Sequence, residues 1–362
     1  METFLSYFSA LPDPRAQNAQ HDLCEILFIA VAAMLCGAKT CTDMALFGRA
    51  KEEALREVLR LPHGIPSHDT FSGLFRRLDP DAFEAAFRRF AQSFGKGLPR
   101  GVVAVDGKAL RRAFGKGQAH APQIMVTAWA SEMRMVLGSR AAPDGNEVKA
   151  VIELLRMLDV KGALVTADAL HCHPVMAQTL IAQGADYILC LKGNHGPLLK
   201  SAVNLLEGVK DIPYAETREE THGRQDIRRA VVVPAPALAA RHGFPGLAAI
   251  GRIESVRAVA DGRAETAVRH FVLSRPLTPA ELLRSVRAHW TIENGLHWVL
   301  DVTLDEDLAR TRKDHGAKNL AFLRRFVLNI LRADTSKGSL AGKIKHAGWN
   351  NHFLFSLLAH MR

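Results

Sequence analysis

The stretch His289-Trp-Thr-Ile-Glu-Asn-Gly-Leu-His-Trp-Val-Leu-Asp301 is the part of the sequence around which the fold is expected to assemble. It lies inside an amphipathic segment that runs from Pro279 to Asp307. Thr278 can act as the N-cap, the proline that follows fits the first helical position, and apolar residues then recur at helical spacing. The sequence therefore predicts an amphipathic helix through this stretch, with Glu293 inside it.

Histidines flank Glu293 at a distance of about one helical turn on either side. In a regular helix, His289, Glu293 and His297 stack along one face, while Trp290 and Leu296 anchor neighbouring faces in the core. A carboxylate held rigidly beside a core is costly without a partner, and a bound metal ion would be a suitable one. The stretch thus carries a candidate metal ligand.

Two further acids follow short apolar runs. Val102-Val-Ala-Val ends in Asp106, and Leu164-Val-Thr-Ala ends in Asp168. Buried strands have this pattern, and their last residues emerge at the carboxyl edge of a sheet. We expect both acids to lie at such an edge and Glu293 to meet them there.

The order of predicted elements around these acids indicates a mixed α/β sheet. Alternating and apolar patterns predict three antiparallel strands, then a helix, a strand, a helix and a strand. The predicted strands are 102–106, 123–130, 133–139, 163–168 and 187–192, and the predicted helices are 146–158 and 174–183. The second and third strands are expected to form a hairpin around Ser131-Glu132.

The segments on either side of this core have different patterns. Residues 1–92 have helical periodicity broken by Pro and Gly, and Gly95–Gly101 is the expected linker. Ser67 is placed to cap a helix, and basic residues are frequent in this part of the chain. These bases could contact DNA phosphates or simply form a solvated helix face, and the sequence does not favour one reading. The basic residues are Arg49, Lys51, Arg56, Arg60, Arg76, Arg77, Arg88 and Arg89.

The segment from about 211 to 275 is rich in strand-forming residues and lies between the second and third acids. Strands are predicted at 228–233, 248–259 and 266–273, with a polar loop at 216–226. We expect a β-rich insertion that leaves the strands of Asp106 and Asp168 next to each other. A long amphipathic helix at 318–332 and a short tail then end the chain.

Composition limits the kind of partner and the cellular environment. Lys plus Arg is 47 and Asp plus Glu is 37, which gives a net charge of +10 and suits a polyanion such as nucleic acid. The 5 cysteines form no Cys-x-x-Cys pair, so a reducing cytoplasm is expected. No signal peptide is indicated, and the longest apolar stretch, 26–38, is too short to span a membrane. Neither His171-Cys-His173 nor the histidines around Glu293 have a standard zinc spacing.

Several motifs in this order resemble the DDE transposases of bacterial insertion sequences, in particular the group of H-repeat-associated proteins. They are Val-Asp-Gly-Lys108, Thr-Ala-Asp-Ala169, Leu-Lys-Gly-Asn194 and the 289–301 stretch. The resemblance covers nearly the whole chain, because Asp13-Pro-Arg15 and Ile65-Pro-Ser-His-Asp-Thr-Phe71 resemble the small domain that precedes the catalytic core in that group.

The resemblance implies an RNase H-like fold and a division of the chain into domains. Residues 1–92 would be an N-terminal helical transposase-associated domain. Residues 100–335 would be the RNase H-like catalytic domain, with its β-rich insertion before the last catalytic helix, and 336–362 a C-terminal tail.

The resemblance also implies the chemistry. Asp106 would bridge two Mg²⁺ ions, for which Mn²⁺ could substitute, while Asp168 and Glu293 would each hold one of them. The enzyme would bind the terminal inverted repeats of its element, cleave there and join the ends to target DNA, acting as a homodimer or larger assembly. It would be cytoplasmic, associate with the nucleoid when bound to DNA, and need no membrane. The rival hypotheses are an inactive DNA-binding remnant and an RNase H-like nuclease that does not join strands.

Residues around the acids are candidates for DNA contacts. They are Lys108, Arg111, Arg112, Lys192, Asn194, His289, His297, Arg310, Arg312 and Lys313. The two histidines could instead support the acids from behind. The sequence departs from the expected family pattern at His173 and His195, where Gln is usual, and the Tyr–Arg pair of the broader superfamily has no counterpart. Asp301, Glu306 and Asp307 are alternatives for the third acid if the helix register differs.

Overall fold

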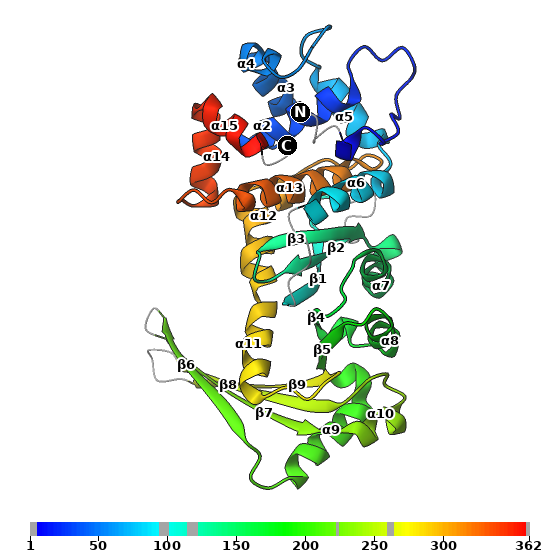
Figure 1. The fold of residues 1–362 in the computed structure, drawn as a ribbon, viewed down its shortest axis with the longest axis vertical. Helices are drawn as coiled ribbons and strands as arrows, with labels where there is room; N and C mark the ends of the chain where they lie inside the picture. Colours follow the sequence, from blue (N-terminus) through cyan, green and yellow to red (C-terminus); the bar gives the residue numbers. More distant parts are fainter. Residues whose placement is uncertain (1–5, 94–100, 114–121, 222–223, 259–263, 360–362) are drawn as a thin grey trace.

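The computed structural model describes residues 6–93, 101–113, 122–221, 224–258 and 264–359. In these ranges, nine strands form one mixed sheet in the order β3-β2-β1-β4-β5-β9-β8-β7-β6 (Figure 1). Strands β1, β4 and β5 are parallel, and all other neighbours are antiparallel. The strands are β1 (Val102–Leu110), β2 (Gln123–Ala130), β3 (Met135–Ala141), β4 (Leu164–Ala167), β5 (Asp186–Leu191), β6 (Tyr214–Thr221), β7 (Arg224–Pro234), β8 (Ala249–Ala258) and β9 (Ala264–Leu273). The predicted mixed α/β sheet of RNase H-like layout is confirmed.

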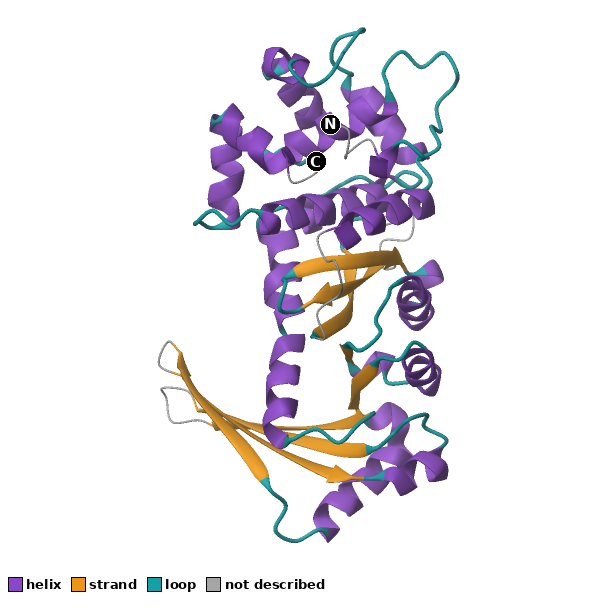
Figure 2. Cartoon of the chain, viewed as in Figure 1, coloured by secondary structure: helices purple, strands orange, loops and turns teal. Residues whose placement is uncertain are grey.

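Helices cover both faces of this sheet (Figure 2). On one face, α7 (Glu147–Met157), α8 (Pro174–Ala182), α9 (Gly196–Gly208) and α10 (Pro236–His242) pack over an apolar cluster that includes Val103 and Val165. On the other face, α11 (Pro279–His289) packs over a cluster that includes Val102 and Leu164. Because successive side chains of a strand point to opposite faces, even-numbered positions here face α11.

The inserted strands extend the sheet from its β5 edge. β9 pairs with β5, so β1 and β4 remain neighbours, as predicted. The insertion is a continuation of the sheet rather than a separate subdomain. The predicted polar loop at 216–226 is wrong, because β6 and β7 occupy most of it. These strands carry little apolar alternation but form cross-strand ion pairs such as Arg229–Glu216, whose Nη2 and Oε2 atoms are 2.9 Å apart.

Helices from both ends of the chain share one apolar core. They are α2 (Leu23–Leu35), α3 (Cys41–Ala50), α4 (Glu52–Arg56), α5 (His68–Arg77), α6 (Pro80–Ser93), α13 (Gly316–Ala333), α14 (Leu340–Trp349) and α15 (Asn351–Ala359). The rings of Phe90 and Phe326 stack 4.0 Å apart between α6 and α13. Ser67 caps α5, and α2 is buried, as predicted.

The predicted domain limits at 92, 100 and 335 stay a prediction. Residues 94–100, most of the expected linker, lie outside the described residues. The segment expected to be a tail contains α14 and α15, which pack against α2 (Figure 1). Among the described residues, no helix combines the length and the apolar composition needed to cross a membrane.

Glu84→Gln is expected to stabilise the fold at alkaline pH. Burial raises the pKa of Glu84 to about 7 from an ordinary 4.5, and its partner Arg88 is 3.5 Å away. The folded state therefore resists ionisation, and this penalty grows as pH rises from 4.5 and is complete above about 7. Chemical denaturation at pH 8 should give a gain of about 1–3 kcal/mol for the variant, and a much smaller one at pH 5. An equal difference at both pH values would contradict this.

Candidate active site

Asp106 and Asp168 lie on neighbouring parallel strands at matching positions. The last paired residues of β1 and β4 are Val105 and Ala167, so each acid is the next residue along its strand. Parallel neighbours are about 4.8 Å apart, and both acids occupy even positions on the α11 face. The predicted strand-end position is correct for Asp168. It is wrong for Asp106, because β1 continues to Leu110 by pairing with β2.

Glu293 begins a wide helical turn. α11 is followed by a π-helical turn, η4 (Glu293–His297), and then by α12 (Trp298–Val302). The N–H of Trp298 donates to the carbonyl of Glu293, five residues earlier. The regular spacing predicted for His289, Glu293 and His297 is therefore wrong. One extra residue is accommodated at this point, and such turns are frequent at functional sites.

Two hydrogen bonds from β2 and its turn fix the helix just before Glu293. Trp129 Nε1 donates to Thr291 Oγ1 at 3.0 Å, and Ser131 Oγ donates to the carbonyl of Ala288 at 2.9 Å. The helix therefore lies against the same sheet face as the two aspartates. Leu296 is buried as predicted.

The prediction for Trp290 is wrong. Its side chain is 38% exposed, and the Arg269 guanidinium lies over its ring at 5.1 Å. Trp290 therefore lines an open surface beside Glu293 instead of anchoring a core.

His289 and His297 each lie close to one of the aspartates. His289 Nδ1 shares a 2.9 Å hydrogen bond with Thr166 Oγ1, and its Nε2 is 3.9 Å from Asp168 Oδ1. His297 Nδ1 is 3.7 Å from Asp106 Oδ2. Burial lowers the pKa of both rings, to about 4 for His297, where the charges of Arg325 and Lys108 lower it further. Both side chains are largely buried, which argues against the predicted DNA contacts, and each ring lies close to one aspartate.

The electrostatics of the acids favour a positive partner. Burial raises the pKa of Asp106 to about 7, and the charges of Asp168 and Glu293 add to the rise. Burial and the charge of Asp168 also raise the pKa of Glu293, while Arg269 lowers it. Repulsion between like charges is thus part of both rises.

A pocket of about 170 Å³ opens beside these acids. Asp168, Glu293, Lys192, Arg269 and Trp290 are among its lining residues. Asp106 borders the region from the β1 side and is not part of the lining. The pocket places oxygen acceptors and cationic side chains side by side.

Within the part of the chain that the structure describes, no three His, Cys, Asp or Glu side chains are close enough to hold a metal ion as they stand. The expected closed set of Asp106, Asp168 and Glu293 is therefore not formed by these side-chain positions. The donor set fits Mg²⁺ chemically, since all three side chains offer carboxylate oxygens.

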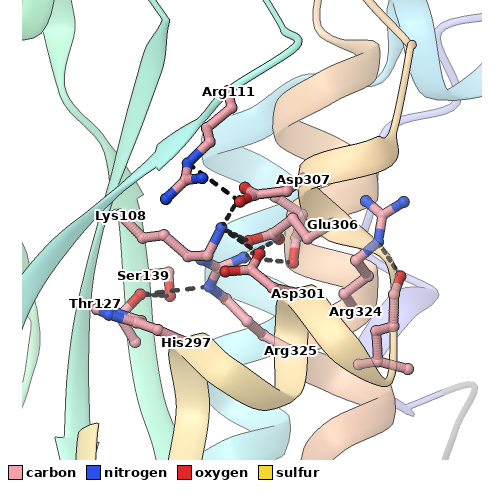
Figure 3. Close-up of polar contacts among 12 residues, drawn as sticks. Lys108, Arg111, Thr127, Ser139, His297, Asp301, Glu306, Asp307, Arg324 and Arg325 are labelled. Carbon is pink, nitrogen blue, oxygen red and sulfur yellow. Dashed lines mark hydrogen bonds and ion pairs between the residues drawn. The ribbon is translucent and has the colours of Figure 1, made fainter. Parts of the chain in front are cut away.

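Lys108 is not available to DNA, and that prediction is corrected. Its ammonium is buried between Asp301 at 2.7 Å, Asp307 at 2.8 Å and Glu306 at 3.4 Å (Figure 3). Burial alone would lower the pKa of Lys108, but Glu306, Asp301 and Asp307 hold it above its ordinary value. Asp301, considered as an alternative third acid, is thus occupied by Lys108.

The other predicted DNA contacts divide into two groups. Arg111, Arg112, Lys192, Arg310, Arg312 and Lys313 are exposed. Lys192 lines the pocket. Arg111 pairs at 3.2 Å with Asp307, and Arg312 donates to the carbonyl of Arg112, so Arg111, Arg112 and Arg312 lie together at one rim. Asn194 donates to the carbonyl of Ala169 at 2.8 Å, which fastens the turn that follows Asp168. Asn194 thus holds the backbone that follows Asp168.

Sequence reasoning missed Arg269 and Thr166. Arg269 lies in β9, far from the acids in sequence, and only its alternation with Ala267 and Phe271 marks a shared strand face. Thr166 precedes Asp168 by two residues, which placed it on the same face, but nothing in sequence paired it with His289.

Comparisons with known proteins cover nearly the whole chain. Residues 5–91 match the family described as "DDE_Tnp_1-associated", and residues 97–330 match the family described as "Transposase DDE domain". The chain is 32% identical over 371 residues to "Putative transposase YncI" of Escherichia coli O157:H7, which covers 99% of this chain and 95% of that one. It is 30% identical over 372 residues to "H repeat-associated putative transposase YhhI" of Escherichia coli (strain K12), covering 99% and 98%.

Among solved structures, one similar chain belongs to a piggyBac transposase synaptic complex with hairpin DNA. The TM-score is 0.43 at 11% identity, over 99% of this chain and 77% of that chain. The family matches and the relatives aligned over nearly their full length identify the family without the structural comparison. This chain belongs to the DDE transposase family.

Proposed function

We propose that this transposase cleaves DNA at the ends of its insertion sequence and joins the freed 3′-hydroxyl to target DNA. The observation that supports the proposal is the placement of Asp106 and Asp168 side by side on two parallel strands, with Glu293 lining the same pocket as Asp168. Breaking a phosphodiester requires charge stabilisation on both the entering and leaving oxygens.

Asp106, Asp168 and Glu293 would hold the metal ions, and Mg²⁺ is the expected cofactor. Bound there, Mg²⁺ supplies the positive charge that stabilises both oxygens of the reacting phosphodiester. The raised pKa of Asp106 and of Glu293 supports this, because a cation would relieve the repulsion that causes part of each rise.

The chain's own residues would orient the acids and bind the DNA backbone. Thr166 is hydrogen-bonded to His289, whose ring lies close to Asp168. His297 lies close to Asp106. Lys192 and Arg269 would contact phosphate oxygens from the pocket, and the exposed rim of Arg111, Arg112, Arg310, Arg312 and Lys313 would bind the flanking backbone.

Double-stranded DNA is the proposed partner, as terminal inverted repeats and as target. The net charge of +10 supports a polyanionic partner. Bringing two ends together requires two active sites, so the acting form would be a dimer or a larger assembly. The proposed location is the cytoplasm, on the nucleoid.

The test uses purified full-length chain and DNA from both borders of its own gene. With Mg²⁺, we expect nicks that leave 3′-hydroxyls at the element ends, and larger strand-transfer products when target plasmid is added. Chelator should abolish both. End binding without nicking would favour the inactive DNA-binding remnant, and nicking without transfer products would favour a nuclease.

A further inference from the structure

A cluster of opposite charges surrounds the ammonium of Lys108, two residues after Asp106 on β1 (Figure 3). We call it the Lys108 cluster: Lys108, Arg324 and Arg325 with Asp301, Glu306 and Asp307. Arg324, Arg325 and Glu306 are almost fully buried. Arg325 pairs with Glu306 at 2.8 Å, and Arg324 donates to the carbonyl of Leu304 at 3.2 Å.

The cluster ties the strand of Asp106 to the helix of Glu293. Lys108 follows Asp106 by two residues, so both side chains lie on the same face of β1. Its ammonium contacts Asp301 in α12, which continues the helix that carries Glu293. Arg325 also donates to Thr127 Oγ1 at 3.3 Å, and Thr127 is the residue paired with Asp106 across β1 and β2.

The wide turn at Glu293 therefore lies between two fixed points. Before it, Trp129 Nε1 holds Thr291, and after it, Lys108 holds Asp301. A π turn is rare, and a return to regular helix would shift the register of the residues that follow it by one. Because each residue turns an α-helix by about 100°, such a shift would aim Glu293 away from the aspartates or turn Asp301 away from Lys108.

Stability alone gives a poor reason for this cluster. Buried ion pairs are often matched or exceeded in stability by apolar residues of similar size, because desolvation offsets their attraction. We propose that Lys108 is a positioning residue, which acts through Asp301 to hold the π turn so that Glu293 faces Asp106 and Asp168. The inference deepens the proposed function and rests on it for the role of Glu293.

Asp301→Asn and Asp307→Asn form the matched pair that tests this. Both variants remove one carboxylate from the same ammonium at nearly equal distance, 2.7 and 2.8 Å, but only Asp301 belongs to the helix of Glu293. Asp307 also pairs with Arg111 of the exposed rim, so the two variants are compared by exchange and kcat rather than by KM. Each leaves Lys108 with two acidic neighbours, so both variants are expected to fold. Lys108→Met would leave three acids without their shared cation and is less suitable.

Two measurements are made on the full-length chain. Hydrogen exchange of residues 293–302 should become about 10-fold faster in Asp301→Asn and change less than about 3-fold in Asp307→Asn. In DNA cleavage, kcat should fall about 10-fold or more in Asp301→Asn with KM for DNA unchanged, and less than about 3-fold in Asp307→Asn.

The two readouts separate failure of this inference from failure of the proposed function. Equal exchange in both variants, or wild-type exchange in Asp301→Asn, would overturn the positioning role whatever the activity. A fall in cleavage that appears only as a higher KM would also overturn it. If the wild-type chain does not cleave DNA, the proposed function fails, while the exchange comparison still decides whether Lys108 fixes this turn.

Discussion

Asp106→Asn is expected to lower DNA cleavage about 10³-fold or more while leaving end binding intact. The substitution keeps the shape of the side chain but removes a charge that would hold metal. Binding of DNA depends mainly on Lys and Arg, none of which is altered, so its log–log salt dependence should stay at the wild-type slope. Paired gel-shift and Mg²⁺-dependent nicking assays on the element ends measure both quantities.

Glu147→Gln is the matched control for this variant. Glu147 is a half-buried acid at the start of α7 whose charge also raises the pKa of Asp106. The Glu147→Gln substitution removes one negative charge close to Asp106, as Asp106→Asn does, and we expect its cleavage rate to stay within about 3-fold of wild type. Wild-type nicking by Asp106→Asn would reject Asp106 as a catalytic ligand. Loss of both folding and binding would show that Asp106 is structural.

Arg325→Met is expected to destabilise the fold by about 3–5 kcal/mol. Arg325 is fully buried, and its guanidinium pairs with the equally buried Glu306 at 2.8 Å. The positive charges of Arg325, Arg324 and Lys108 hold the pKa of Glu306 below its ordinary value despite the burial. Removal of Arg325 leaves that carboxylate with the charge of Arg324 and the longer, 3.4 Å pair to Lys108. Denaturant unfolding at pH 7 measures the loss.

The double variant Arg325→Met/Glu306→Gln serves as the control. It removes both charges of the 2.8 Å pair, so neither is left without the other. We expect it to be more stable than Arg325→Met alone. A loss under about 1 kcal/mol in the single variant, or a double variant less stable than the single, would contradict the claim that Glu306 depends on Arg325.

The sequence was most informative where apolar periodicity decides the structure. The runs before Asp106 and Asp168 predict buried parallel neighbours because apolar residues fill both faces of those strands, and the structure confirms this. The boundary at Asp106 was missed because Asp-Gly is typical of a turn, whereas pairing with β2 carries the strand past Gly107.

Contacts between distant residues could not be predicted from local patterns. Lys108 precedes Arg111 and Arg112 and so resembled a solvated basic run, yet its partners lie nearly two hundred positions further along the chain, with Asp307 at a separation of 199. The π turn at Glu293 has the same cause. Its sequence fits a regular helix, whereas the contacts made at Thr291, Gly295 and Asp301 come from residues far away in the sequence.

The central claim is that the strand acids Asp106 and Asp168 act together in one site, and a double-mutant cycle tests it most directly. Cleavage of the element ends is measured for wild type, Asp106→Asn, Asp168→Asn and the double variant, under conditions in which all four bind DNA equally. If the acids act together, each single variant loses nearly all activity and the double variant is no worse than either. Losses that multiply in the double variant, or near wild-type cleavage by either single variant, would contradict the claim.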